Sequence, residues 1–259
     1  MHNYRGAPLG AIAGDIIGSV YEHRPIKHTR FALFGAESRF TDDTVLTVAT
    51  AHALLEGGDY GTTYRSFGRR YPHAGHGGTF YQWIFDEGMG AYGSYGNGSA
   101  MRASPIGWAV STVDEVLAEA ERSAAVTHNH PEGVKGAQAV ALAILLARSG
   151  TQREAIRAEI STRFNYDLDR TVEEIRPTYS FDVTCQGSVP EAIVAFLDSK
   201  SVEHAIRLAI SLGGDADTQA AIAGSIAEAF YGGVPSEIAE RVRHRLTPDL
   251  LKGMDEFAT

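Results

Sequence analysis

The sequence predicts an all-α fold in which residues 1–259 form a single domain. Three observations support this prediction. Apolar residues recur at intervals of three and four residues in several long segments, as in helices with one buried face. Alternation of apolar and polar residues, the pattern of a half-buried strand, is scarce, and the best strand candidate, residues 179–185, is short. No linker, repeat or low-complexity tract divides the chain.

The helical pattern is clearest in four segments, which in chain order are residues 45–54, 113–120, 137–146 and 205–212. Residues that commonly end helices occur at Gly57-Gly58, Ser149-Gly150, Gly213-Gly214 and Gly232-Gly233. Thr151 and Ser201 each precede a helical pattern, and we expect them to cap helix starts.

Two segments carry small residues at a spacing of four, which places them on one face of a helix. The first contains Gly10, Gly14 and Gly18, and the second contains Ala216, Ala220 and Gly224. Glycine inside a helix costs about 0.5–1 kcal/mol relative to alanine, so this spacing predicts a close crossing of helix backbones. We interpret it as core packing that positions the residues at the helix ends.

Composition excludes several classes of function. The net charge is −9 and no Lys/Arg block occurs, which argues against sequence-specific nucleic-acid binding and against an anionic membrane surface. No run of 18 apolar residues and no export signal is evident, so we expect a cytoplasmic protein. The single cysteine, Cys185, fits a reducing compartment and is interpreted as a small buried residue. The oligomeric state stays open.

The stretch FTDDTV places Asp42 and Asp43 directly after Thr41, at the front of an apolar run. One interpretation is helix capping, because the helix dipole favours negative charge in the first turn. A second stretch, GGDADT, again offers two carboxylates and a threonine: Asp215, Asp217 and Thr218. If the two helix starts converge, these oxygen atoms would form a site for Mg²⁺, Mn²⁺ or Ca²⁺, and cations would relieve the repulsion between the carboxylates.

The chain resembles the ADP-ribosylglycohydrolase family, which includes ADP-ribosyl-arginine hydrolases and the enzyme that reactivates dinitrogenase reductase. The resemblance runs through GAIAGDIIGSVYE, FTDDTV, GSYGNGSAMRASPIGW, THNHPEGVKGA and GGDADTQAAIAGSIAEAFYG. It implies a compact orthogonal bundle of helices with two Mg²⁺ or Mn²⁺ ions, whose ligands match Thr41, Asp42, Asp43, Asp215, Asp217 and Thr218. It also implies a functional glutamate near the metals, which matches Glu22.

The glycine-rich loop of the family, which holds the diphosphate and ribose of ADP-ribose, matches residues 93–101. The substrate-binding candidates there are Ser94, Tyr95, Gly96, Asn97, Gly98, Ser99 and Met101. Small residues let backbone N–H groups approach phosphate oxygens, although such clusters are also ordinary turns. Tyr95 could stack on adenine or ribose, or lie exposed. Arg102 could pair with a phosphate or with a surface acid.

Two histidine-containing segments have further candidates. His128, in the stretch THNHP, matches the family's TH segment and is expected to contact substrate or to support residues that do. His130 is expected to be structural. The loop of residues 71–78, YPHAGHGG, could line the entrance to the site or be a solvated loop.

These residues lead us to hypothesise hydrolysis of the glycosidic bond at C1″ of an ADP-ribosyl group. Glu22 is the candidate acid/base; alternatively, it binds metal and Asp43 handles the proton. Other hypotheses are a non-catalytic ADP-ribose binder and a metal-dependent nucleotide phosphohydrolase. The chain has GGDADT where many relatives have GGDTDT, and Ser94 stands where some arginine-directed relatives carry an acid. The scissile linkage, to arginine, serine, a nucleotide or an acetyl group, therefore stays open.

Overall fold

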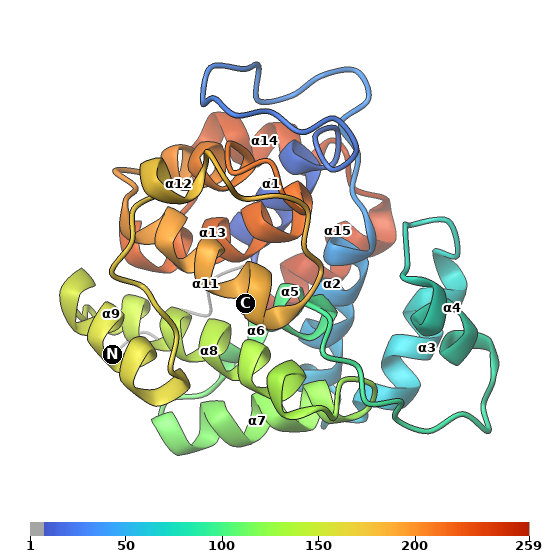
Figure 1. The fold of residues 1–259 in the computed structure, drawn as a ribbon. Coiled ribbons are helices and arrows are strands. Elements are labelled where there is room, and N and C mark those ends of the chain that lie inside the picture. Colours follow the sequence, from blue (N-terminus) through green and yellow to red (C-terminus); the bar gives the residue numbers. More distant parts are fainter. Residues whose placement is uncertain (1–7, 259) are drawn as a thin grey trace.

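The structure, a computed structural model, describes residues 8–258 and consists of helices joined by irregular connections (Figure 1). No residue in that range lies in a named strand, as predicted. The expected strand candidate, residues 179–185, instead forms an isolated antiparallel bridge between Thr184 and Gly96. The helices are α1 (Leu9–Gly18), α2 (Asp42–Leu55), α3 (Tyr60–Arg70), α4 (Gly78–Phe85), α5 (Gly98–Met101), α6 (Ser104–Ala109), α7 (Val113–Ala125), α8 (Pro131–Arg148), α9 (Arg153–Phe164), α10 (Val172–Ile175), α11 (Cys185–Leu197), α12 (Val202–Ile210), α13 (Ala216–Tyr231), α14 (Ser236–Arg243) and α15 (Pro248–Ala258).

The four segments with the clearest helical pattern fall in α2, α7, α8 and α12. Ser201 caps α12, because its hydroxyl accepts a hydrogen bond from the His204 N–H at 3.1 Å. The expected cap at Thr151 is wrong. Helix α9 has Gln152 as its N-cap residue, and no side chain caps it.

Helices α1 and α13 cross in the centre of the molecule, and the small residues on their facing surfaces make contact. A Cβ atom added to Gly10 would overlap the backbone of Gly224, and one added to Gly14 would overlap that of Ala220. At the end of α1, a Cβ atom on Gly18 would lie 2.5 Å from the Ala216 carbonyl oxygen. The helices therefore run antiparallel, and the end of α1 lies against the beginning of α13.

The remaining helices surround this pair (Figure 1). Helices α8, α11 and α12 pack against α13, and α7 packs against the other side of α8. Helix α2 contacts α1 and leads to α3 and α4, which lie at one side of the molecule. The core contains apolar residues from most of these helices, which form one cluster. The two predicted ligand segments thus open helices that both pack on α1.

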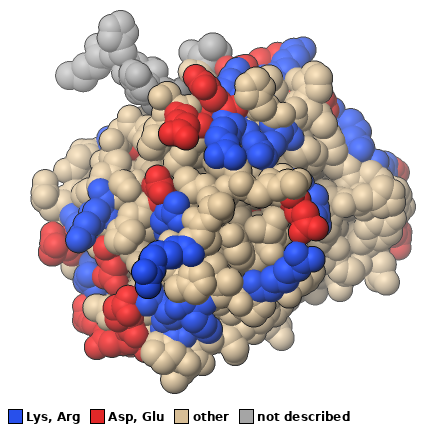
Figure 2. Space-filling view, turned by 90° about the horizontal axis from the view of Figure 1, so that it is seen from above, with Lys and Arg blue, Asp and Glu red and all other residues tan. Residues whose placement is uncertain are grey.

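Two further properties bear on function. Among the helices of residues 8–258, none is both long and apolar enough to cross a bilayer. On the face shown in Figure 2, Lys and Arg side chains are interspersed with Asp and Glu. That face therefore has no continuous basic surface of the kind that binds a nucleic-acid backbone.

Candidate active site

The start of α2 is held by Asp15, a buried residue on α1. Its carboxylate accepts hydrogen bonds from the Thr41 N–H at 2.9 Å, the Thr41 hydroxyl at 2.7 Å and the Thr44 N–H at 3.1 Å. The Thr44 hydroxyl donates to it as well. Burial raises the pKa of Asp15 to about 6, against the opposing effect of these hydrogen bonds. Asp15 therefore fixes the segment that carries Asp42 and Asp43.

Sequence reasoning missed Asp15. It lies within the stretch GAIAGDIIGSVYE, where the available signal is an acidic residue inside an otherwise apolar segment with glycines at a spacing of four. A carboxylate is almost never buried in such a segment without partners.

The two ligand segments meet at a direct contact. The Thr218 hydroxyl donates a hydrogen bond of 3.2 Å to Oδ2 of Asp43, across 175 positions of sequence. The helix-capping interpretation is also correct. Thr41 is the N-cap residue of α2, and its hydroxyl accepts a hydrogen bond from the Asp43 N–H at 3.3 Å. The structure therefore brings together the two helix starts that the sequence singled out.

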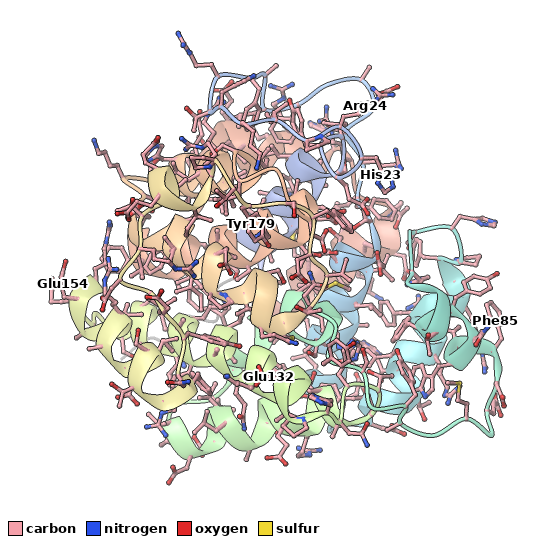
Figure 3. All side chains as sticks on the ribbon, in the orientation of Figure 1. His23, Arg24, Phe85, Glu132, Glu154 and Tyr179 are labelled. Atoms are coloured by element: carbon pink, nitrogen blue, oxygen red, sulfur yellow. The ribbon has the colours of Figure 1, made fainter. Side chains whose placement is uncertain are left out.

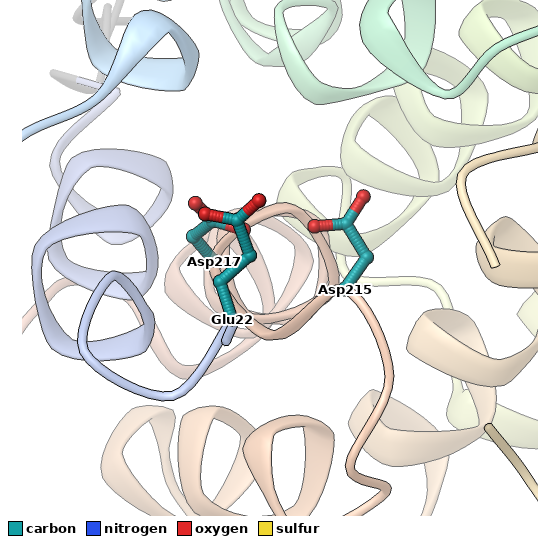
Figure 4. A group of neighbouring side chains, drawn as sticks. All are labelled: Glu22, Asp215 and Asp217. Atoms are coloured by element: carbon teal, nitrogen blue, oxygen red, sulfur yellow. The ribbon is translucent and has the colours of Figure 1, made fainter. Parts of the chain in front are cut away.

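Glu22 joins the second segment. Ligand oxygen atoms of Glu22, Asp215 and Asp217 all lie within 4.8 Å of one another. Figure 4 shows the three carboxylates pointing to the same side, Glu22 from the connection after α1 and the two aspartates from the start of α13. Glu22 reaches this position because the glycine contacts place the end of α1 against the start of α13.

Electrostatic repulsion is strong in this cluster. Burial, followed by the charge of Asp15, raises the pKa of Asp43 well above its ordinary value. Burial, followed by the charge of Asp215, does the same for the pKa of Asp217. Burial also raises the pKa of Glu22, with Asp215 as the next cause. Carboxylates this close disfavour one another's ionised form unless a positive charge lies between them.

The residues present fit a site for divalent cations. Oδ1 of Asp43 is buried and has no hydrogen-bond partner in residues 8–258, so it has an unused acceptor inside the cluster. The other candidate donors are carboxylate and hydroxyl oxygens, the ligands that Mg²⁺ and Mn²⁺ prefer. Asp42 lies at the open edge of the cluster, where its side chain is 18% exposed.

A cavity of about 720 Å³ opens over this cluster. It lies within the size range of small-molecule sites. Its wall includes all the ligand candidates and most of the predicted substrate-binding residues, namely Ser94, Tyr95, Gly96, Asn97, Gly98, Met101 and His128. Ser99 does not line it: this residue is buried, and its hydroxyl donates to the Gly133 carbonyl at 2.7 Å.

The glycine-rich loop is tied to the start of α11. The Asn97 N–H donates to the Val183 carbonyl at 2.8 Å, and the Cys185 N–H donates to the Tyr95 carbonyl at 2.8 Å. The Gly93 N–H donates to the side chain of Asn129 at 2.7 Å. Several of the loop's N–H groups are therefore used within the protein, and its shape is fixed by these bonds.

Asn97 links this loop to the acidic cluster. Its side-chain amide donates to Oδ2 of Asp215 at 2.7 Å and to the Ser188 hydroxyl at 3.2 Å. The Met101 sulfur lies 3.9 Å from the Thr218 hydroxyl. The middle and the C-terminal end of the loop region thus contact the predicted ligands.

His128 and Arg102 lie beneath the loop. The His128 ring is buried, its Nδ1 lies 2.8 Å from the Thr127 hydroxyl, and burial lowers its pKa well below the usual range. The interpretation of Arg102 as a surface ion-pair partner is wrong, whereas its pairing with a phosphate stays a prediction, since Arg102 lines the cavity. Its side chain is fully buried, donates to the Ser123 carbonyl at 3.2 Å and to the Thr127 hydroxyl at 3.0 Å, and stacks 4.2 Å from the centre of the Tyr64 ring.

Cys185 supports the loop from below. Its thiol is buried and lies 3.1 Å from the Gly96 carbonyl oxygen, and burial raises its pKa to about 12. Such a thiol is a poor nucleophile. The contact agrees with the interpretation of Cys185 as a small buried residue.

The loop of residues 71–78 packs against Asp42. The Asp42 N–H donates to the Ala74 carbonyl at 2.9 Å, and Nδ1 of the buried His76 ring lies 3.6 Å from Oδ2 of Asp42. Gly75 adopts a φ of 108°, which favours glycine, and a Cβ atom there would lie 3.3 Å from Oδ1 of Asp42. His73 lines the cavity. This loop therefore forms part of the cavity wall.

Comparison with known proteins agrees with this geometry. The chain is 28% identical to ADP-ribosylhydrolase ARH3 of Mus musculus over an alignment 309 positions long, gaps included. The alignment covers 88% of this chain and 84% of the relative. It is 28% identical to ADP-ribosylarginine hydrolase Tri1 of Pseudomonas putida, with 92% of this chain and 73% of the relative covered. A solved structure described as an ADP-ribosylglycohydrolase-related protein complex matches with a TM-score of 0.75 and 27% identity, over 99% of this chain and 95% of that one.

The family model described as ADP-ribosylglycohydrolase matches residues 1–258. Together with the helical fold and the two converging acidic segments, this match shows that the chain belongs to the ADP-ribosylglycohydrolase family.

Proposed function

We propose that this protein hydrolyses the glycosidic bond at C1″ of an ADP-ribosyl group and releases ADP-ribose. We further propose that two divalent cations, Mg²⁺ or Mn²⁺, are held by Thr41, Asp42, Asp43, Asp215, Asp217 and Thr218. The observation that carries the proposal is the hydrogen bond between Thr218 and Asp43, because it joins the two groups of oxygen ligands at the floor of one cavity.

When bound, such cations would polarise ribose hydroxyls and lower the pKa of a coordinated water toward neutrality. The protein side chains supply the geometry around them. Asp15 holds Thr41 and the start of α2, and Asn97 holds Asp215. Because these two supporting side chains are buried, the ligand oxygens are positioned before substrate arrives.

Glu22 is the better candidate for proton transfer. Its side chain is 31% exposed and lines the cavity, so a leaving group can reach its carboxyl. Asp43 is buried, and one of its oxygens accepts from Thr218. Burial raises the pKa of Glu22, which favours the protonated form that a general acid needs. In this role Glu22 gives its proton to the departing atom and later removes one from the attacking water.

The glycine-rich loop and His128 are proposed to hold the ADP-ribose. Tyr95 is half exposed at the cavity rim, which leaves its ring free to stack on a base or a ribose. His128 is kept neutral by burial, so it can accept or donate a single hydrogen bond without adding charge. A Cβ atom added to Gly98 would lie 3.1 Å from Nε2 of His128, so the absence of a side chain there lets the loop approach the ring closely.

The proposal is tested by incubating the protein with ADP-ribose conjugates of arginine, serine, a nucleotide and acetate, with and without Mg²⁺ or Mn²⁺. Metal-dependent release of free ADP-ribose from at least one conjugate is the expected result. Release of AMP instead would indicate a nucleotide phosphohydrolase. Binding of ADP-ribose without release from any conjugate would indicate a non-catalytic binder.

A further inference from the structure

The contacts along the cavity have a fixed order. The glycine-rich loop reaches Asp215 through Asn97 at 2.7 Å. Asp215 lies within 4.8 Å of Glu22, and Oε2 of Glu22 lies 3.7 Å from Nε2 of His23. If the loop holds the diphosphate and the acidic cluster holds the distal ribose, the group attached to C1″ extends toward Glu22 and His23. The leaving group therefore exits on this side.

The residues that line the cavity include three basic side chains here called the basic rim, namely His23, Arg39 and His73. His23 follows Glu22 directly. Arg39 is exposed, and its charge acts on Glu22. His73 precedes Ala74, whose carbonyl accepts the Asp42 N–H.

The positive charge of Arg39 is free to act on a ligand. The Arg39 guanidinium forms no hydrogen bond or ion pair within residues 8–258, whereas the nearby Arg24 pairs with Glu37 at 3.0 Å. Figure 3 shows His23 and Arg24 projecting from the connection between α1 and α2. In the part of the chain that the structure describes, the acidic residues lining the cavity are only those of the candidate metal cluster, namely Glu22, Asp42, Asp43, Asp215 and Asp217.

We propose that the basic rim selects ADP-ribosyl conjugates whose leaving group carries a negative charge next to the scissile bond, and that Arg39 is the main specificity-determining residue. The inference rests on the proposed hydrolase function. A guanidinium leaving group would meet the like charge of Arg39, and the acidic side chains of the cavity belong to the candidate metal cluster. A phosphoryl group would meet a planar guanidinium that matches it with two parallel hydrogen bonds.

ADP-ribose 1″-phosphate is the probe for this chemistry. In its hydrolysis the C1″–O bond breaks, the oxygen of water bonds to C1″, and phosphate leaves with the bonding electron pair. One proton of the water goes through Glu22 to the departing phosphate oxygen. Since a phosphatase would give the same products, the reaction is run in water enriched in heavy oxygen. Cleavage at C1″ leaves the released phosphate unlabelled.

The experiment compares kcat/KM for ADP-ribose 1″-phosphate and for ADP-ribosyl-arginine, with Mg²⁺ present. The variants are Arg39→Glu and, as a matched control, Arg30→Glu, which makes the same charge change at an exposed position of the same connection outside the cavity wall. Binding of free ADP-ribose is measured by calorimetry for each protein.

The unsubstituted protein is expected to prefer the phosphate conjugate by about tenfold or more, and Arg39→Glu to lower that preference by about tenfold or more. Arg30→Glu should leave the preference within about twofold. Faster hydrolysis of the arginine conjugate, or labelled phosphate, would overturn the inference while leaving ADP-ribosyl hydrolysis or ADP-ribose binding to be judged separately. Loss of ADP-ribose affinity in Arg39→Glu would also overturn it, because Arg39 would then serve the diphosphate. No release from either conjugate would overturn this inference, and the hydrolase function would then be judged from the serine, nucleotide and acetate conjugates.

Discussion

The Thr218 hydroxyl donates a hydrogen bond of 3.2 Å to the Asp43 carboxylate, so the first turns of α2 and α13 meet at one point. Each of these turns is also packed on α1. The positions of the acidic side chains therefore depend on how α1, α2 and α13 pack. Substitutions that disturb this packing should lower both the free energy of unfolding and the affinity for metal.

Metal binding should stabilise the folded protein. A ligand at a hundred times its dissociation constant adds about 2.7 kcal/mol to the free energy of unfolding. We expect Mn²⁺ to raise the melting temperature, and Asp43→Asn to abolish that rise, because the variant removes a buried ligand oxygen. Asp169→Asn, at an exposed position, is the control. A rise that persists in Asp43→Asn would contradict the assignment of Asp43 as a ligand.

Substituting Asp15 should lower both the stability of the protein and its affinity for Mn²⁺, because Asp15 holds the segment that carries the ligands. In Asp15→Asn, one carboxylate oxygen becomes an amide group that cannot accept from Thr41 or Thr44. Leaving a buried donor unpaired costs about 1–3 kcal/mol, so the free energy of unfolding should fall by that amount in urea titrations. Mn²⁺ affinity by calorimetry should fall as well. Asp114→Asn, at an exposed position in the first turn of α7, is the matched control. Unchanged stability and Mn²⁺ affinity in Asp15→Asn would rule out this supporting role.

Glu22→Gln should lower turnover with little effect on ADP-ribose binding. Proton transfer by a positioned side chain contributes about 10²–10⁴-fold to rate, and glutamine cannot transfer a proton. We expect kcat to drop within that range while calorimetry still detects Mn²⁺ and ADP-ribose. Glu37→Gln, on the same connection, should retain activity. Near-normal turnover in Glu22→Gln with metal bound would exclude Glu22 as the acid/base.

The α1–α13 crossing should not tolerate a side chain at Gly14. Because a Cβ atom there overlaps the Ala220 backbone, Gly14→Ala forces the helices apart, and overpacking of this kind costs about 1–3 kcal/mol or more. Gly61→Ala is the comparison, since Gly61 lies in α3 with room for a Cβ atom. That variant should be stabilised by about 0.5–1 kcal/mol. Equal stability of the two variants in urea titrations would show that the close crossing is not required.

Glu228 predicts a pH dependence of stability. Its buried carboxyl accepts from the Gly10 N–H at 2.7 Å, and burial raises its pKa from 4.5 to about 8. Because the folded state binds this proton more tightly than the unfolded state, the contribution is fully present below pH 4.5 and is lost as pH rises through about 8. In Glu228→Gln, the free energy of unfolding should no longer fall for this reason as the pH rises.

The measurement is the free energy of unfolding at intervals between pH 5 and 9, for Glu228→Gln and for Glu237→Gln as an exposed control. The relevant quantity is the difference in slope, which amounts to about 1.4 kcal/mol per pH unit for one proton. Parallel curves for the unsubstituted protein and Glu228→Gln would argue against a protonated Glu228 in the folded state.

Much of the fold was predictable because its signals are local. The spacing of apolar residues identified α2, α7, α8 and α12, and the Ser201 cap was recognisable within four residues. The failed cap at Thr151 shows the limit of such signals, since a start that looks capped can shift by one residue without changing the buried face. The close crossing of α1 and α13 was also predictable, because glycines at a spacing of four have few other uses in a helix.

The acidic ligand candidates of the site were predictable from the sequence, but the buried residues that hold them in place were not. Residue types alone indicated Asp42, Asp43, Asp215 and Asp217. Asp15 was missed, and one interpretation of Arg102 placed it at the surface. Both are charged residues whose partners come from other segments. Sequence indicates that a charge is present but not whether it is buried, and burial decides whether it becomes a surface group or a structural one.

The sequence by itself determined that the chain is helical, that two helices open with paired carboxylates and a threonine, and that small residues allow one close crossing. These features depend on neighbours within a turn or two. Only the tertiary structure decided that Thr218 reaches Asp43, that Asp15 anchors α2, and that Arg39 lies by Glu22. The physical reason is that such contacts depend on how helices pack, and packing depends on shape complementarity over the whole core.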